Sequence, residues 1–199
     1  HSSSYCWGSE DECLYEDVYS EVSMWSLTKE SRNIIQFYGY SVKVDNDDVS
    51  LYIIMEKTKA NGDLKSYIGD HEFWVQLTER EYDDSNSQTL LYHDGEYWEY
   101  IMSQKAKINL MVKMVNAVKD LHDSNVVHSD IKPQNMLYDG ENVKLIDFNA
   151  SVYLGDKMCI KGKREQGTPG YMPKEMYKGE ISYKSDIYEL GVSFLEIWF

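Results

Sequence analysis

Residues 128–149 restrict the fold of this chain more than any other stretch. A polar loop at 128–135 is followed, within 136–148, by two short apolar segments that Asp139-Gly140 separates. That dipeptide favours a tight turn between paired strands. The stretch therefore predicts a loop and then a β-hairpin whose second strand returns beside the loop.

Four polar side chains of this stretch suit phosphoryl transfer from a nucleotide–magnesium complex. The loop carries Asp130, Lys132 and Asn135, and Asp147 ends the hairpin, so the four can face one site. Oxygen ligands from separate segments, completed by nucleotide phosphates, suit Mg²⁺. An ammonium group can offset charge on the transferred phosphate, and a second carboxylate can orient the attacking hydroxyl. A single loop aspartate or asparagine is more often a turn or cap residue, so the indication comes from the set.

Charge and cysteine content exclude several other classes. The formal charge of −14 argues against a nucleic-acid or anionic-membrane surface, because both need basic patches. No apolar run is long enough to span a membrane, and residues 1–13 lack the apolar core of a secretion signal. Cys6, Cys13 and Cys159 form no close C-x-x-C pair, so we expect reduced thiols in a cytoplasmic or nuclear protein.

The rest of the chain is predicted to be α+β, with the sheet confined to the N-terminal part. We expect helices at 14–29, 61–68, 105–125 and 183–199, strands at 33–44, 49–55, 136–138 and 143–148, and an extended, turn-rich segment at 149–180. Residues 70–103 mix aromatic and acidic residues without a clean period, which predicts an irregular surface insert.

Two of the predicted helices carry informative apolar patterns. In the helix at 105–125 the apolar residues at helical spacing are Ile108, Met111, Val115, Val118 and Leu121 (or His122). The helix at 183–199 is apolar almost all round, which is typical of a buried helix.

The 128–149 stretch resembles the catalytic loop and metal-binding turn of eukaryotic protein kinases, whose signature is H-R-D-L-x-x-x-N followed by D-F-G. Lys132 resembles the serine/threonine subgroup. Residues 167–175 are similar to the segment that ends in A-P-E, and 185–191 resemble the start of the central helix. The resemblance implies a bilobal kinase fold, with a small β lobe, a regulatory helix and a mainly helical large lobe.

The resemblance also implies roles for particular residues, with ATP and Mg²⁺ as cofactors. Asp130 would accept or orient the proton of the substrate hydroxyl, Lys132 would contact the γ-phosphate, and Asn135 and Asp147 would hold Mg²⁺. Residues implied around ATP are Met55 as gatekeeper, Glu56, Lys57 and Thr58 as the adenine-facing hinge, Asp63 at the ribose, and Leu137 under the adenine ring or as an ordinary core leucine.

Further residues receive structural or regulatory roles from the same resemblance. They are Glu21 (or Glu16) in the regulatory helix, Trp25, His128 and Phe148 in the core, Thr168 beside the catalytic loop, Glu175 at the end of the A-P-E-like segment, and Asp186 as a brace of the loop backbone.

The chain departs from the kinase pattern at several positions. No glycine-rich phosphate loop and no V-A-I-K lysine precede the regulatory helix. Ser129 replaces an arginine that pairs with an activation-loop phosphate, so phosphorylation should be a weaker on-switch. Asn149 replaces a glycine; asparagine tolerates left-handed angles, so metal geometry should survive with less hinge freedom. Glu175 would need an arginine partner from beyond Phe199.

Three functions follow as hypotheses, in this order. The first is an ATP- and Mg²⁺-dependent serine/threonine kinase acting on protein substrates. Residues 1–58 would be a remnant of its small lobe and 59–199 an incomplete large lobe, truncated at both ends and inactive as a fragment. The second is a pseudokinase that binds or scaffolds. The third is a small-molecule phosphotransferase with a similar H-x-D-x-x-x-x-N loop.

Overall fold

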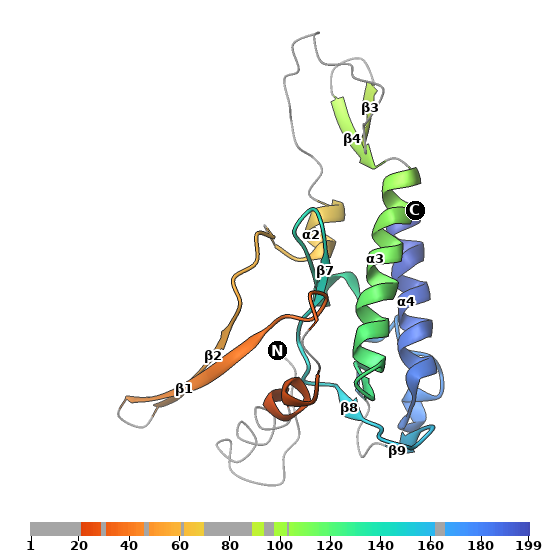
Figure 1. Ribbon diagram of the computed structural model, residues 1–199. Coiled ribbons are helices and arrows are strands. Elements are labelled where there is room, and N and C mark those ends of the chain that lie inside the picture. The colour runs from red at the N-terminus through yellow and green to blue at the C-terminus, as the bar shows by residue number, and fades with distance from the viewer. Residues whose placement is uncertain are drawn as a thin grey trace.

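Two long helices, α3 (Gln104–His122) and α4 (Tyr183–Trp198), run antiparallel and side by side along one edge of the molecule (Figure 1). The computed structural model describes residues 21–28, 31–45, 48–60, 62–69, 89–93, 98–102, 104–161 and 166–199. Helix α3 ends where Asn125 takes a left-handed backbone conformation, with φ of 60°. At the start of α4, the Ser182 N–H donates to the Ser185 hydroxyl.

The hairpin predicted after the 128–135 loop is present. Strands β6 (Met136–Tyr138) and β7 (Val143–Leu145) pair in antiparallel register, and β7 ends earlier than expected. The turn is stabilised by Asp139, whose Oδ1 accepts the backbone N–H groups of Glu141 and Asn142 at 2.9 and 2.7 Å. The hairpin therefore holds the residues after the loop in a fixed place beside α3.

The hydrophobic core lies between α3, the 128–135 loop and the β6–β7 hairpin. The fully buried apolar side chains of α3 and of this region include Leu110, Met114, Leu121, Ile131, Met136 and Leu145. The face predicted for α3 was partly wrong, because Ile108 and Val115 are exposed at 51 % and 43 %. The helix is apolar on two sides, and the periodicity did not identify the side that packs against the hairpin.

Strands β1 (Phe37–Asp45) and β2 (Asp48–Met55) form a hairpin that projects away from the two long helices (Figure 1). It is attached through residues 33–35: the Leu145 N–H donates to the Asn33 carbonyl at 2.9 Å, and the Ile35 N–H donates to the Leu145 carbonyl at 3.1 Å. The first strand begins at Phe37 rather than at residue 33, because residues 33–35 pair with β7 instead. Residues 21–27 are helical, and the first part of the helix expected at 14–29 lies outside the described residues.

The remaining elements are short. They are α2 (Leu64–Gly69), β3 (Thr89–His93), β4 (Trp98–Met102), β5 (Val126–Val127), the 3₁₀ turns η1 (Pro133–Asn135) and η2 (Met176–Lys178), β8 (Val152–Tyr153), β9 (Ile160–Lys161) and β10 (Glu180–Ile181). The antiparallel pairing of β3 with β4 corrects the expectation of a wholly irregular insert at 70–103. Aromatic and aliphatic residues flank Asp94-Gly95 there, and that strand–turn–strand signal was overlooked.

Helix α4 also departs from its predicted environment. Its buried residues include Ser185, Asp186, Glu189 and Ser193, while Ile187 and Leu195 are exposed. Asp186 and Glu189 of α4 face the 128–135 loop, whose backbone N–H groups donate to their carboxyl groups. Among the described residues, no helix combines the length and the apolarity needed to cross a membrane.

Candidate active site

The backbone of the 128–135 loop is held by a buried carboxylate of α4. The N–H groups of His128 and Ser129 donate to Asp186 Oδ2 and Oδ1 at 2.9 and 2.8 Å. His122 at the end of α3 also contacts Asp186, with 2.7 Å between Nε2 and Oδ2. A buried carboxylate needs such partners, because burial without them is costly. Asp186 therefore braces the loop as the resemblance implied.

Asp130 is the centre of a compact polar network. Its Oδ2 accepts hydrogen bonds from Lys132 Nζ at 2.8 Å and from Asn135 Nδ2 at 2.9 Å. Asn135 Nδ2 also donates to the Asp130 carbonyl oxygen at 2.9 Å. Charge-assisted bonds of this kind are stronger than neutral ones and fix side-chain direction. Three of the four residues predicted to converge are thus in direct contact.

Thr168 closes this network from the segment before α4. Its hydroxyl donates to Asp130 Oδ1 at 2.6 Å and accepts from Lys132 Nζ at the same distance. The hydroxyl therefore joins the carboxylate and the ammonium group, which are 38 and 36 residues away in the chain. The contact expected between Thr168 and the loop is confirmed.

Asp147 lies beside the same loop through its backbone neighbours. The N–H of the preceding residue, Ile146, donates to the Asn135 carbonyl at 3.0 Å. Asp147 itself adopts a left-handed conformation, with φ of 63°, and its side chain is exposed. Among the described non-glycine residues only Asn125, Ser129 and Asp147 have positive φ, so the left-handed angle anticipated at Asn149 falls instead on Asp147.

The oxygen atoms at this edge fit a magnesium ion. Because Asn135 Nδ2 is bound to Asp130, the amide Oδ1 is the atom of that side chain that remains for a metal. Asp147 offers an exposed carboxylate from a separate segment. Mg²⁺ prefers a few protein oxygen donors and completes its coordination with water and phosphate oxygens, so this pair of side chains is chemically suited to it.

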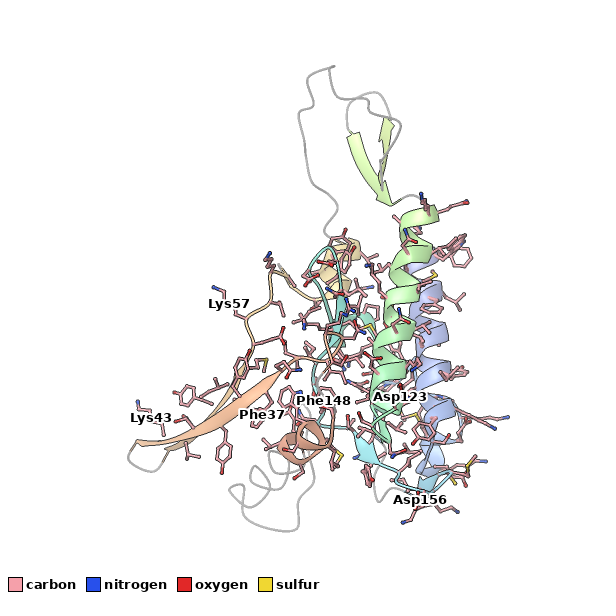
Figure 2. All side chains as sticks on the ribbon, viewed as in Figure 1. Phe37, Lys43, Lys57, Asp123, Phe148 and Asp156 are labelled. Carbon is pink, nitrogen blue, oxygen red and sulfur yellow. The ribbon has the colours of Figure 1, made fainter. Side chains whose placement is uncertain are left out.

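Four rings form a continuous column from β1 to the loop. Trp25 stacks on Phe37 and contacts Phe148, with ring centroids 5.4 Å apart in both pairs, and Phe148 contacts His128 at 5.3 Å. His128 Nε2 lies 3.0 Å from the Ile146 carbonyl, which can only accept, so Nε2 carries the proton. The core packing expected for Trp25, His128 and Phe148 is confirmed, and Phe37 is a member that sequence reasoning missed (Figure 2 labels Phe37 and Phe148).

Glu21 lies at the side of this column, near Asp147. Burial raises the pKa of the Glu21 carboxyl, the charge on Asp147 raises the pKa further, and a backbone hydrogen bond from Phe148 lowers it. The helix thus places a buried acid close enough to Asp147 for the two carboxyl groups to interact electrostatically. Glu16, the alternative, lies outside the described residues.

The connector from β2 to α2 holds the residues expected around ATP. Met55 ends β2 with an exposed side chain, and Lys57 and Thr58 follow on the connector (Figure 2 labels Lys57). Asp63 forms an isolated bridge with Leu137, and its Oδ1 accepts the Ser66 N–H at 2.8 Å, which caps α2. Leu137 is partly buried against the core. Its bridge with Asp63 places it next to the connector.

Glu56 has a role that sequence reasoning missed. Its carboxylate pairs with Lys144 of β7 at 2.8 Å and accepts the Gln36 N–H at 3.0 Å. The Glu56 N–H donates to the Gln36 carbonyl at 2.9 Å. These contacts fasten the connector to the base of the β1–β2 hairpin and to β7. Glu56 and Lys144 are 88 residues apart in the sequence, and no local pattern indicates that they form an ion pair. Lys144 was therefore not predicted as a partner of the connector.

The segment before α4 carries the last two residues of interest. Glu175 is half-buried at the start of η2, where its carbonyl accepts the Lys178 and Glu180 N–H groups. Tyr171 donates its hydroxyl to Glu196 of α4, which also pairs with Lys65 of α2. Burial, together with the hydrogen bond to Glu196, raises the pKa of Tyr171 to about 12.

A fold with a strand pair and helix on one side, mainly helices on the other, and an Asp–Lys–Asn–Thr cluster beside a second aspartate defines the class of protein kinases. The chain matches the protein kinase domain over residues 8–199. It is 30% identical over 185 residues to serine/threonine-protein kinase KIC1 of Saccharomyces cerevisiae, covering 92% of this chain and 14% of that protein. It is 31% identical over 193 residues to human serine/threonine-protein kinase Nek2, covering 96% of this chain and 38% of Nek2.

A putative serine/threonine-protein kinase, R436 of Acanthamoeba polyphaga mimivirus, is 38% identical over 89 residues, covering 43% of this chain and 32% of that protein. The chain belongs to the protein kinase domain family, and its fold is the α+β bilobal kinase fold. It spans less than two fifths of the length of each of these relatives.

Proposed function

We propose that the protein containing this chain transfers the γ-phosphoryl group of ATP, with Mg²⁺, to serine or threonine hydroxyls of protein substrates. The observation that carries the proposal is the network in which Asp130 accepts from Lys132, Asn135 and Thr168. All four side chains are fixed before any substrate arrives, and such preorganisation is how enzymes lower the barrier to transfer.

Each residue has one part in this proposal. Asp130 accepts the proton of the attacking hydroxyl, and Lys132, which lies 2.8 Å from it, faces the transferred phosphate as a positive charge. Asn135 Oδ1 and the Asp147 carboxylate hold the metal, which supplies charge neutralisation to the phosphates when bound. Thr168 is hydrogen-bonded to both Asp130 and Lys132 and so holds the two side chains in a fixed orientation relative to each other.

A pseudokinase is the second candidate, and one observation favours it. Burial and Asp147 both raise the pKa of Glu21, an effect that a nearby lysine would oppose. A pseudokinase that binds its partners through this fold, without transferring phosphate, would tolerate such an acid at position 21.

The test uses the full-length protein with radiolabelled ATP, Mg²⁺ and a mixture of protein acceptors, in parallel with sugar and amine acceptors. We expect label on protein serine and threonine, dependent on Mg²⁺ and lost in Asp130→Asn. Glu180→Gln, a carboxyl-to-amide change at a half-exposed side chain outside the network, should leave transfer unchanged. Nucleotide binding without transfer would instead support the pseudokinase, and preferred label on a sugar or amine would support a small-molecule phosphotransferase.

A further inference from the structure

Glu189 of α4 is a fully buried acid with a contact to the 128–135 loop. Its Oε2 accepts the backbone N–H of Ile131 at 2.8 Å. Its Oε1 is buried as well and has no hydrogen-bond partner within the described part of the chain. An unpaired polar group in the core lowers the stability of the fold, so a buried acid of this kind needs a structural or functional explanation.

Glu189 and Asp186 form one bracket around Asp130. They are three residues apart on α4 and therefore share a helix face. Asp186 holds the N–H groups of His128 and Ser129, and Glu189 holds that of Ile131. The peptide units on both sides of Asp130 are thus fixed by carboxyl groups of a single helix.

The charges around Glu189 favour its neutral form. Burial, with a further contribution from the charge on Asp186, raises its pKa to about 9. The Ile131 N–H and Lys132 lower this pKa, while Asp130 raises it. His122 of α3 faces Asp186 rather than Glu189. At neutral pH Glu189 is therefore a neutral carboxyl, so it adds no negative charge next to Asp186 on this helix face.

We propose that Glu189 is a positioning residue that, together with Asp186, sets the backbone on both sides of Asp130 for phosphoryl transfer. The proposal rests on the proposed function and deepens it, because the bracket acts on the same aspartate. Ionisation of Glu189 at high pH places a negative charge beside Asp186 and Asp130. The repulsion between these charges and the cost of burying the new charge outweigh the stronger hydrogen bond from Ile131, so the bracket is destabilised. Transfer should therefore fall as the pH rises through about 9.

Two substitutions in the full-length protein separate positioning from simple packing. Glu189→Gln keeps the shape and an oxygen that accepts the Ile131 N–H, but it cannot ionise. We expect kcat close to wild type at neutral pH, without the alkaline fall. Glu189→Ala removes the acceptor, and kcat should fall by roughly 10²-fold, the effect of misplacing reacting groups by about 1 Å, with KM for ATP little changed. Glu180→Gln serves as the matched control and should keep the wild-type alkaline fall.

Amide hydrogen exchange at Ile131, measured by NMR, tests the bracket independently of transfer. We expect strong protection in the wild type and in Glu189→Gln, and weak protection in Glu189→Ala even where the rest of α4 stays protected. Unchanged protection in Glu189→Ala, or a wild-type alkaline fall in Glu189→Gln, overturns the proposal. If the wild type transfers no phosphate, the proposed function fails, and the exchange result still decides whether Glu189 positions the loop.

Discussion

The 128–135 loop and the β1–β2 hairpin differ in how completely the chain itself determines their structure. In the loop, buried carboxyl groups of α4 hold three backbone amides, and Asp130 has hydrogen bonds to both of its carboxylate oxygens. On the hairpin, side chains that are apolar or aromatic are exposed on both faces, including those of Tyr38, Tyr40, Val42, Tyr52 and Ile54.

This difference separates the two halves of the proposed reaction. The groups that would act on the acceptor hydroxyl, Asp130 and Lys132, are hydrogen-bonded to each other and to Thr168. The groups that would hold the nucleotide lie along β2 and its connector, where Met55 and Lys57 are exposed. The loop should therefore respond sharply to single substitutions, and the hairpin face should respond weakly.

The largest expected effect comes from the metal-binding turn. Asp147→Ala removes the exposed carboxylate proposed as a Mg²⁺ ligand. We expect loss of Mg²⁺-dependent transfer to the background of the assay, because the phosphate charge is no longer neutralised at the site. The free energy of unfolding should change little, since the side chain is exposed. Transfer at the wild-type rate by Asp147→Ala would refute the metal role.

The second prediction concerns the hydroxyl between Asp130 and Lys132. Thr168→Val removes the donor to Asp130 and the acceptor for Lys132 while keeping the side-chain shape. A hydrogen bond to a charged group contributes about 1.5–3 kcal/mol, so kcat should fall by roughly 10- to 100-fold. Thr168→Ser keeps the hydroxyl and should stay near wild type. Equal kcat for Val and Ser would show that the network does not hold the site.

The third prediction tests how closely the segment before α4 must approach the loop. A Cβ at Gly167 would lie 2.8 Å from the Ser129 carbonyl oxygen and 3.0 Å from Met172 Cγ, and φ there is +106°. Gly170 has a similar φ of +97°, but a Cβ there would meet nothing within 4 Å. Each change to alanine carries the backbone strain of a disfavoured φ, about 1–3 kcal/mol.

Only Gly167→Ala adds the clash, and because Thr168 is the next residue, it should also lower transfer. Denaturant unfolding and steady-state kinetics on both variants separate the two effects. Gly170→Ala should lose stability alone. If Gly167→Ala loses no more activity than Gly170→Ala, the close approach to Ser129 does not position Thr168.

Sequence reasoning located the loop well because its functional residues are close together in the chain. Asp130, Lys132 and Asn135 fall within six residues, and the turn at Asp139-Gly140 returns the chain toward them. Their partner Thr168 is far along the chain, and it was assigned only through the resemblance to kinases. Glu189 went unnoticed because an acid in a helix is ordinarily solvated, and nothing local shows that it faces a buried amide.

For the β1–β2 hairpin and the helices, the sequence predicted the elements but not their tertiary contacts. The β1–β2 strands were predicted as two segments that pair with each other, but the pattern did not show that residues 33–35 pair with β7. In α3, apolar residues on two sides left the period ambiguous, so Ile108 and Val115 were placed on the core side although they are exposed. Periodicity identifies an amphipathic element, and the tertiary neighbours decide which apolar side is buried.

The smallest expected effect is on the hairpin. Tyr40 is 60% exposed and lies opposite Ile53, whereas Phe37 at the start of the same strand stacks on Trp25. Tyr40→Thr keeps a residue that favours strands, so the free energy of unfolding should change by no more than about 0.5 kcal/mol. Phe37→Ala should cost about 3 kcal/mol, because it removes a ring from the column that reaches His128. Denaturant unfolding of the full-length protein measures the change in the free energy of unfolding for both variants. If Tyr40→Thr costs as much as Phe37→Ala, another part of the protein covers the exposed face of the hairpin. The hairpin and the loop would then not differ in their response to single substitutions.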